Sequence, residues 1–272
     1  MSIELEPLIK LSKDIKNLSK TVSRNEARYL VDTYYQLQNY RIRSANQLRE
    51  DEPQQVLGWL FENFQVLERN IKSVLSTYSQ ASPLGQWSES IVGIGPVISA
   101  GLMAHIDIEK APTAGHIWSF AGIYGDKQVW NKGKKRPWNA DLKVLCWKIG
   151  ESFVKVSNNE KDFYGKIYQE RKAIEVQRNA DGMFKEQADK ALKRLKDKST
   201  ITYNRNSEGF LSDAHIHARA KRYAVKIFLS HWHQVAYELH YKKPAPKPYV
   251  IEHQGHVHFI KVPNWTSVVE PF

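Results

Sequence analysis

Apolar residues recur at helical spacing through most of the chain, so the sequence predicts a mostly α-helical fold. The first 80 residues contain a short amphipathic segment at 7–20 and two long ones, at 23–49 and from Pro53 onward. Ser23 and Glu26 form the Ser-x-x-Glu pattern of a capping box, which opens a helix. We expect the two long helices to pack as an antiparallel hairpin. Their apolar positions are Ala27, Leu30, Val31, Tyr34 and Leu37 in the first, and Val56, Leu57, Leu60, Phe61, Phe64, Leu67, Ile71, Val74, Leu75 and Tyr78 in the second.

The same spacing predicts further helices at residues 83–91, 96–106, 112–122, 139–156 and 213–243. The helix that begins at Asn139 or Asp141 should turn inward Leu142, Leu145, Cys146, Ile149 and Phe153. The last helix should bury Ala224, Val225, Phe228, Leu229, Trp232, Val235, Ala236 and Leu239.

A polar stretch at 159–198 predicts two helices interrupted at Asn179–Gly182, which either protrude, pack loosely or pair with another subunit. We expect residues 199–210 to be a polar loop and the weakly alternating tail at 249–260 to form a short β-hairpin. The chain therefore divides into a helical hairpin region (1–82), a core (83–158), polar helices with a loop (159–210) and a basic helix with a tail (211–272).

The turn between the helices at 83–91 and 96–106 reads Val92-Gly93-Ile94-Gly95-Pro96. Glycine can adopt a positive φ, and proline is tolerated in the first turn of a helix. Backbone amides at Gly93, Ile94, Gly95 and Val97 would then point outward at a helix N-terminus, which suits an anion such as a phosphate. The alternative is an ordinary corner between two helices, in which the two glycines serve only the tight turn.

The net charge of the whole chain supports an anionic partner for this turn. The 272 residues carry a net charge of +11 and have a pI near 9.5, so an anionic partner is expected, nucleic acid more than a membrane surface. The single cysteine, Cys146, excludes an internal disulfide and a multi-cysteine zinc site. The first residues lack a signal-peptide pattern and no apolar run reaches membrane-spanning length, so we expect a cytoplasmic protein without a membrane partner.

Cations gather at two further places. Trp130 and Trp138 flank a loop that contains Lys132, Lys134, Lys135 and Arg136. Cations beside stacking surfaces suit a phosphate backbone or an unstacked base, although the two tryptophans could equally anchor a solvated loop to the core. The last helix begins with a second basic patch, Arg219, Lys221, Arg222 and Lys226. Arg41 and Arg43, near the end of the first long helix, suit either a solvated face or a phosphate contact.

The Val92–Pro96 turn, the small and apolar run to Ile106, the stretch Phe120-Ala-Gly-Ile123, the basic loop and the late basic helix resemble a known domain. It is the C-terminal, helix-hairpin-helix-containing domain of the DEDD insertion-sequence transposases, also known as RNA-guided recombinases. The similarity covers roughly residues 85–240 and is strongest at 90–125. It implies a unit that holds duplex DNA by backbone amides without reading the sequence.

The chain departs from that family in two respects. The family has an N-terminal RNase-H-like domain with four acidic metal ligands, whereas the first 80 residues here predict only helices. The family also uses a serine nucleophile after the Phe-Ala-Gly-like stretch, and this chain has no serine between Ser119 and Ser152. The resemblance therefore implies a transposase-derived binding protein of a phage, plasmid or other mobile element, without the cutting chemistry.

Histidines and carboxylates give no catalytic constellation. His215 and His217, like His231 and His233, are two residues apart and do not share a helix face. The remaining metal candidates are His253, His256 and His258; otherwise we expect the histidines to lie at the surface or at interfaces. The acidic residues show no converging set of the kind that two-metal phosphodiester chemistry requires.

No catalytic residue, metal or cofactor is therefore assigned, and the function expected is non-catalytic binding of duplex DNA through its phosphates. The alternatives are an active recombinase or nuclease with an unfamiliar site, and a scaffold that binds structured RNA. The protein could also form homo-oligomers.

Overall fold

The computed structural model describes residues 13–48, 55–124, 130–246 and 260–267, and within these ranges it contains helices and no strand. This confirms the predicted mostly α-helical class. In chain order the elements are α1 (Lys13–Leu18), a 3₁₀ turn η1 (Ser19–Thr21), α2 (Arg24–Gln47), α3 (Gln55–Gln80), α4 (Pro83–Ser90), α5 (Pro96–His105), a 3₁₀ turn η2 (Ile108–Lys110), α6 (Ala114–Phe120), α7 (Ala140–Val156), α8 (Tyr164–Ala180), α9 (Lys185–Leu192), α10 (Ile201–Ser207) and α11 (Asp213–Tyr241). The predicted β-hairpin falls almost entirely on residues 247–259, outside the described ranges.

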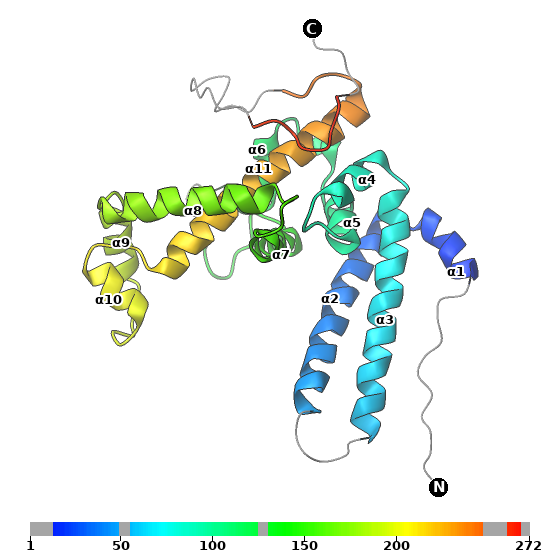
Figure 1. The fold of residues 1–272 in the computed structure, drawn as a ribbon, viewed down its shortest axis with the longest axis horizontal. Helices are drawn as coiled ribbons and strands as arrows, with labels where there is room; N and C mark the ends of the chain where they lie inside the picture. Colours follow the sequence, from blue (N-terminus) through cyan, green and yellow to red (C-terminus); the bar gives the residue numbers. More distant parts are fainter. Residues whose placement is uncertain (1–12, 49–54, 125–129, 247–259, 268–272) are drawn as a thin grey trace.

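The long helices α2 and α3 lie side by side and extend away from the centre of the molecule (Figure 1). The capping box is present at the start of α2: Ser23 Oγ accepts from the Glu26 amide at 3.2 Å, and the Ser23 amide donates to the Glu26 carboxylate at 2.7 Å. Such a cap contributes about 1 kcal/mol. The inner end of the hairpin packs on α5, where one small core contains Val31, Leu75, Val97 and Ala100.

The main core surrounds α11, which packs against α4, α6, α7 and α8. Its centre is aromatic: the rings of Phe153 on α7 and Tyr164 on α8 stack with centroids 5.0 Å apart, and Phe228 on α11 meets both edge to face. All five residues that we expected to turn inward on α7 are buried. Because α11 contacts elements from both 83–158 and 159–210, those segments share a single core.

The polar stretch after α7 forms the two expected helices, α8 and α9, with Gly182 between them at a φ of +73°. Helix α8 packs along α11 (Figure 1). The expectation of a loop at 199–210 was wrong, since residues 201–207 form α10, capped by the Thr200 hydroxyl, which accepts from the Tyr203 amide at 3.1 Å.

A small third core and the side chain of Asn179 hold α8, α9 and the start of α11 together. The core contains Phe184 and Ala188 of α9 with Leu211 and Ile216. Asn179, which is buried, donates to the Leu211 carbonyl at 3.0 Å and accepts from the Leu211 amide at 2.9 Å.

Residues 260–267 return to the main core. Val262 is buried there, and the indole of Trp87 on α4 donates to the Pro263 carbonyl at 2.9 Å. Trp265 donates in turn to the Glu238 carboxylate of α11 at 2.9 Å. Among the helices of the described residues, none combines the length and the apolar character needed to cross a bilayer.

Candidate nucleic-acid interface

The basic loop, residues 130–138, folds around its own first tryptophan. The indole Nε1–H of Trp130 donates to the Lys134 carbonyl at 2.6 Å, and the Arg136 guanidinium lies 5.5 Å from the centre of the same ring. Trp130 therefore shapes the turn and supports a cation. The other cationic side chains of the loop are exposed: Lys132, Lys134 and Lys135.

Trp138 attaches the end of the loop to the protein. Its ring lies against Gly122, where φ is +64° and an added Cβ would lie 2.7 Å from Trp138 Cγ, so this contact requires glycine. Next to it, the Asn139 amide donates to the Phe120 carbonyl at 2.8 Å. The Lys143 ammonium lies 4.1 Å from the centre of the same ring. Trp138 thus contacts both the backbone at Gly122 and a cation.

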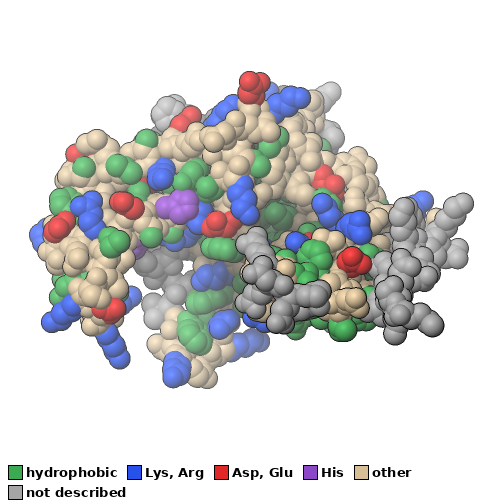
Figure 2. Space-filling model, turned by 60° about the horizontal axis from the view of Figure 1, so that its bottom comes forward, with side chains coloured by type: hydrophobic (Ala, Val, Ile, Leu, Met, Phe, Trp, Pro, Cys, Tyr) green, Lys and Arg blue, Asp and Glu red, His purple; other side chains and the backbone are tan. Residues whose placement is uncertain are grey.

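A cleft of about 460 Å³ opens beside Lys143, where α8, α9 and α11 meet α7 and the chain that follows α6. We call it the basic cleft. Five cationic side chains line it against one carboxylate, that of Glu175; they are Lys143, Arg171, Arg219, Arg222 and Lys226. Figure 2 shows one face of the molecule, on which Lys and Arg side chains are interspersed with exposed apolar ones.

Glu175 holds the arginines of the cleft in place. Its carboxylate is 1% exposed and pairs with Arg219 at 2.7 Å, with Arg178 at 3.5 Å and with Arg171. Burial alone would raise the pKa of Glu175, but the hydrogen bonds and charges of Arg219 and Arg171 outweigh it and lower that pKa. Arg219 also stacks on Phe184, 4.3 Å from the ring centre. One carboxylate against three guanidinium groups leaves a net charge of +2 on this cluster.

Lys143 joins the basic loop to the basic patch of α11. Burial lowers the pKa of Lys143, and the charges of Arg136 in the loop and Arg222 on α11 lower it further. Burial and Arg222 likewise lower the pKa of Lys226. Lys143 contacts Trp138 at the end of the basic loop and lines the basic cleft together with Arg222 and Lys226 of α11, so these two regions, far apart in sequence, meet at Lys143.

The glycine turn, residues 92–96, lies at the other end of α7. Gly93 has a φ of +94°, and the Ser152 hydroxyl donates to its carbonyl at 2.5 Å. Nine residues of helix separate Ser152 from Lys143, about 14 Å along the axis. The structure therefore does not bring the glycine turn and the basic cleft together.

Not every predicted amide of this turn is available to a ligand. The Ile94 amide donates to the Ile91 carbonyl at 2.9 Å, and the side chains of Ile94 and Val97 are buried. The prediction for Ile94 was therefore wrong, because its N–H closes the turn itself. The amides of Gly93, Gly95 and Val97 have no acceptor among the described residues.

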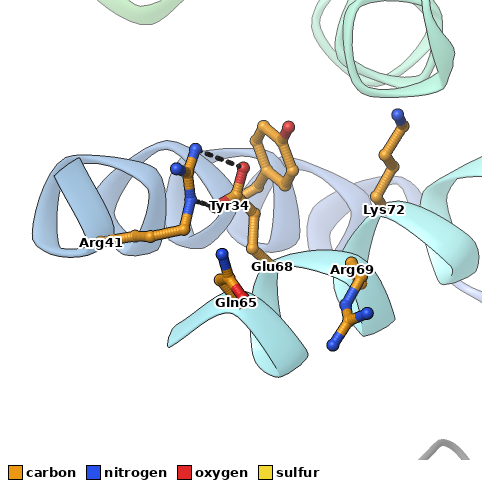
Figure 3. A pocket seen from close by; sticks show the side chains of 6 residues that line it. All are labelled: Tyr34, Arg41, Gln65, Glu68, Arg69 and Lys72. Atoms are coloured by element: carbon orange, nitrogen blue, oxygen red, sulfur yellow. Dashed lines mark hydrogen bonds and ion pairs between the residues drawn. The ribbon is translucent and has the colours of Figure 1, made fainter. Parts of the chain in front are cut away.

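A second cationic recess, of about 300 Å³, lies between α2 and α3 (Figure 3). Arg41 and Glu68 face each other across it, with Nε and Oε2 2.6 Å apart, while Arg69 points away. Glu68 is 9% exposed. The pKa of Tyr34 is raised by burial and, in addition, by the negative charge of the Glu68 carboxylate. Arg41 thus forms an ion pair within the hairpin.

Two histidines of α11, His231 and His233, are buried, whereas we expected surface or interface positions; His240 of the same helix is exposed. His231 is buried; its Nε2–H donates to the Ile260 carbonyl at 2.8 Å, and its Nδ1 accepts from the Tyr164 hydroxyl at 2.7 Å. Burial lowers the pKa of His231 to about 4. His233 is buried too and donates to the Ala111 carbonyl at 2.7 Å. Both side chains therefore serve as internal hydrogen-bonding groups.

Within the ranges that the structure describes, no three potential metal ligands converge. The candidates His253, His256 and His258 lie outside those ranges.

Two cations of the cleft were missed by sequence reasoning, Lys143 and Arg171. Lys143 follows the Asn139 cap by four residues, at the point where the basic loop meets α7, and this adjacency was a usable signal. Arg171 sits on a helix with many charges and had no distinguishing pattern. No family model, curated protein or solved structure compared with the chain matches it.

Proposed function

We propose that this protein binds duplex DNA by its backbone phosphates, without cutting it, through the basic cleft and the basic loop. The observation that carries the proposal is the position of Lys143, which stacks on Trp138 and shares its electrostatic environment with Arg136 and Arg222. Exposed cations on one surface are what a polyanionic backbone requires. The resemblance to a transposase helix-hairpin-helix domain favours DNA and a mobile-element origin.

The arginines and the lysines have different parts in this proposal. Arg171 and Arg219 are fixed by Glu175 and give the floor of the cleft a positive potential. Lys132, Lys134 and Lys135 are exposed on the loop and long enough to follow the phosphates of one strand. Since these are contacts to the backbone, binding should depend little on the base sequence.

The central test is the salt dependence of binding, measured by fluorescence anisotropy on two labelled 30-base-pair duplexes of unrelated sequence. We expect log Kd to rise linearly with log salt for both, with a slope of about 0.9 for each phosphate contact. Lys135→Ala should lower that slope by about one unit. The control is Lys20→Ala, which removes an exposed lysine from η1 and should leave the slope unchanged.

Several outcomes would overturn the proposal. A flat salt response, or equal slopes for Lys135→Ala and Lys20→Ala, would show that the basic loop makes no phosphate contact. Preference for a structured RNA over both duplexes would indicate the RNA scaffold instead. Cleavage of supercoiled DNA in the presence of magnesium, manganese or zinc would indicate a nuclease or recombinase.

The glycine turn provides a second contact in this proposal, through the amides of Gly93, Gly95 and Val97. Gly95 is the N-cap of α5, with a φ of −95° and open space around an added Cβ, so a side chain can be introduced there. Asp and Asn are both favourable N-caps and differ in charge. We expect Gly95→Asp to weaken DNA binding relative to Gly95→Asn; equal affinities would exclude the turn from the interface.

A further inference from the structure

An apolar recess of about 200 Å³ adjoins the basic cleft, between α7 and α11. Its lining includes Ile123, Cys146, Trp147 and Val225, and it shares Ile123, Lys143 and Arg222 with the basic cleft. The recess is smaller than the 300–1,000 Å³ typical of sites for whole ligands. It therefore suits a single flat ring system.

Gly150, Lys221 and Cys146 also line the recess. An added Cβ at Gly150 would lie 3.4 Å from both Lys221 Cβ and Val225 Cγ2, which is ordinary van der Waals contact. Lys221 lines the recess with its side chain, and its ammonium pairs with Glu151. Cys146 is buried, which keeps its thiol protonated.

Trp147 forms the exposed wall of the recess. Trp147 is 60% exposed, which is unusual for tryptophan, a residue that is highly buried on average. Trp130 and Trp138 differ, because their rings already support Arg136 and Lys143. Trp147 is thus an indole at the edge of the cleft that the described contacts do not use for packing a cation.

We propose that the recess beside Trp147 receives one unstacked nucleobase of a strand whose phosphates lie in the basic cleft. This inference rests on the proposed function and narrows its substrate class to nucleic acid with unpaired or extruded nucleotides. The choice of occupant follows from charge: Lys143 and Arg222 rim both hollows, so whatever enters the recess must tolerate two cations at its edge. A base carried on a phosphate backbone meets that condition, whereas an apolar protein surface does not.

The test separates base contacts from phosphate contacts. A labelled 20-nucleotide single strand is compared by anisotropy with a strand of the same length in which five central nucleotides are abasic, and with the corresponding RNA. The two DNA strands carry the same phosphates. Since stacking of one base on an aromatic ring contributes about 1–3 kcal/mol, the complete strand should bind roughly 5- to 150-fold more tightly. The RNA shows whether a 2′-hydroxyl is accepted.

Trp147→Ala should abolish that difference while leaving the salt slope unchanged, and Trp147→Phe should retain most of it. The matched control is Val144→Ala, which removes another exposed apolar side chain from α7, 53% exposed, and should change neither quantity. Because both positions are exposed, circular dichroism should show folded variants.

The results distinguish this inference from the proposed function. If the wild type binds both DNA strands equally but Lys135→Ala still lowers the slope, the recess binds no base and the phosphate contacts remain. If the wild-type protein binds neither the duplexes nor the single strands, both proposals are wrong. If Trp147→Ala changes the molecular mass in solution and leaves the base preference intact, the recess is an interface between copies of the chain, and this inference is wrong.

Discussion

Replacing Glu175 with glutamine should destabilise the packing of α8 on α11. Glu175 is 1% exposed and faces three guanidinium groups, and the substitution keeps its shape while removing its charge. The arginines Arg171, Arg178 and Arg219 would then repel each other without compensation.

The expected magnitude follows from the burial of the carboxylate. Breaking a buried ion pair by removing one partner costs about 3–5 kcal/mol. The arginines remain partly exposed, at 23% for Arg219 and 35% for Arg178, and water will screen part of their repulsion, so the lower end of that range applies. In a domain of this size, about 3 kcal/mol corresponds to a decrease in melting temperature of roughly 10 °C.

The pH dependence gives a second measurement. The pKa of Glu175 is lowered in the folded state, so its contribution is present above the unfolded pKa of about 4.3 and is lost as the pH falls through the folded pKa. The stability difference between wild type and Glu175→Gln should thus be constant from pH 6 to 8 and shrink below about pH 4. Urea unfolding followed by circular dichroism measures it at each pH. The control is Glu170→Gln, an exposed carboxylate on the same helix. Equal stabilities of the two variants would refute the reasoning.

Three further predictions concern backbone strain, buried histidine and the cysteine. Gly93→Ala should lower the unfolding free energy in urea by about 2 kcal/mol, since φ is +94° and its Cβ would lie 3.1 Å from a Val156 methyl; Gly95→Ala, with nothing within 4 Å of its Cβ, should cost less, about 0.5–1 kcal/mol, because alanine is the poorer N-cap of α5. The folded pKa of His231, about 4, lies below its unfolded value of about 6.5, so its stabilisation should be lost as the pH falls from 6.5 to 4, by about 3 kcal/mol. His231→Gln should remove that part of the pH dependence in urea titrations, and an unchanged profile would contradict it. Cys146, with its thiol pKa raised to about 12 by burial, should resist iodoacetamide at pH 8 until the protein unfolds; labelling of the folded protein at the rate of a free thiol would contradict the structure.

The helices could be predicted from the sequence because their signals are local. Apolar spacing located α2, α3, α7 and α11, and caps such as Ser23 and Asn139 marked where two of them begin. Helix α10 has a capping residue, Thr200, but lacks apolar spacing. It is seven residues long and polar, with only Asn206 buried, so periodicity gave no reason to expect it.

Interactions between distant residues explain what the sequence did not predict. His233 is buried because its ring donates to the Ala111 carbonyl, 122 positions away, and no local pattern shows that an acceptor will be present. The same holds for the candidate interface. The cations of the basic loop and of α11 were evident as charges, but their meeting at Lys143 depends on how α7 packs against α11.

The basic cleft brings like charges close together, and their repulsion lowers the stability of the folded protein. A site of this kind favours an anionic ligand, which would relieve the repulsion. Burial lowers the pKa of both Lys143 and Lys226, and Arg222 lowers each of them further. A ligand that binds only the folded protein stabilises it by about 2.7 kcal/mol at a hundred times its Kd. A polyanion should therefore raise the melting temperature, and because it relieves the repulsion, it should also raise the pKa of Lys143. The thermal shift with heparin at low salt, followed by its loss at 1 M salt, measures the first effect. If heparin leaves the melting temperature unchanged at low salt, the crowded cations do not form an anion-binding surface, and both proposals lose their electrostatic basis.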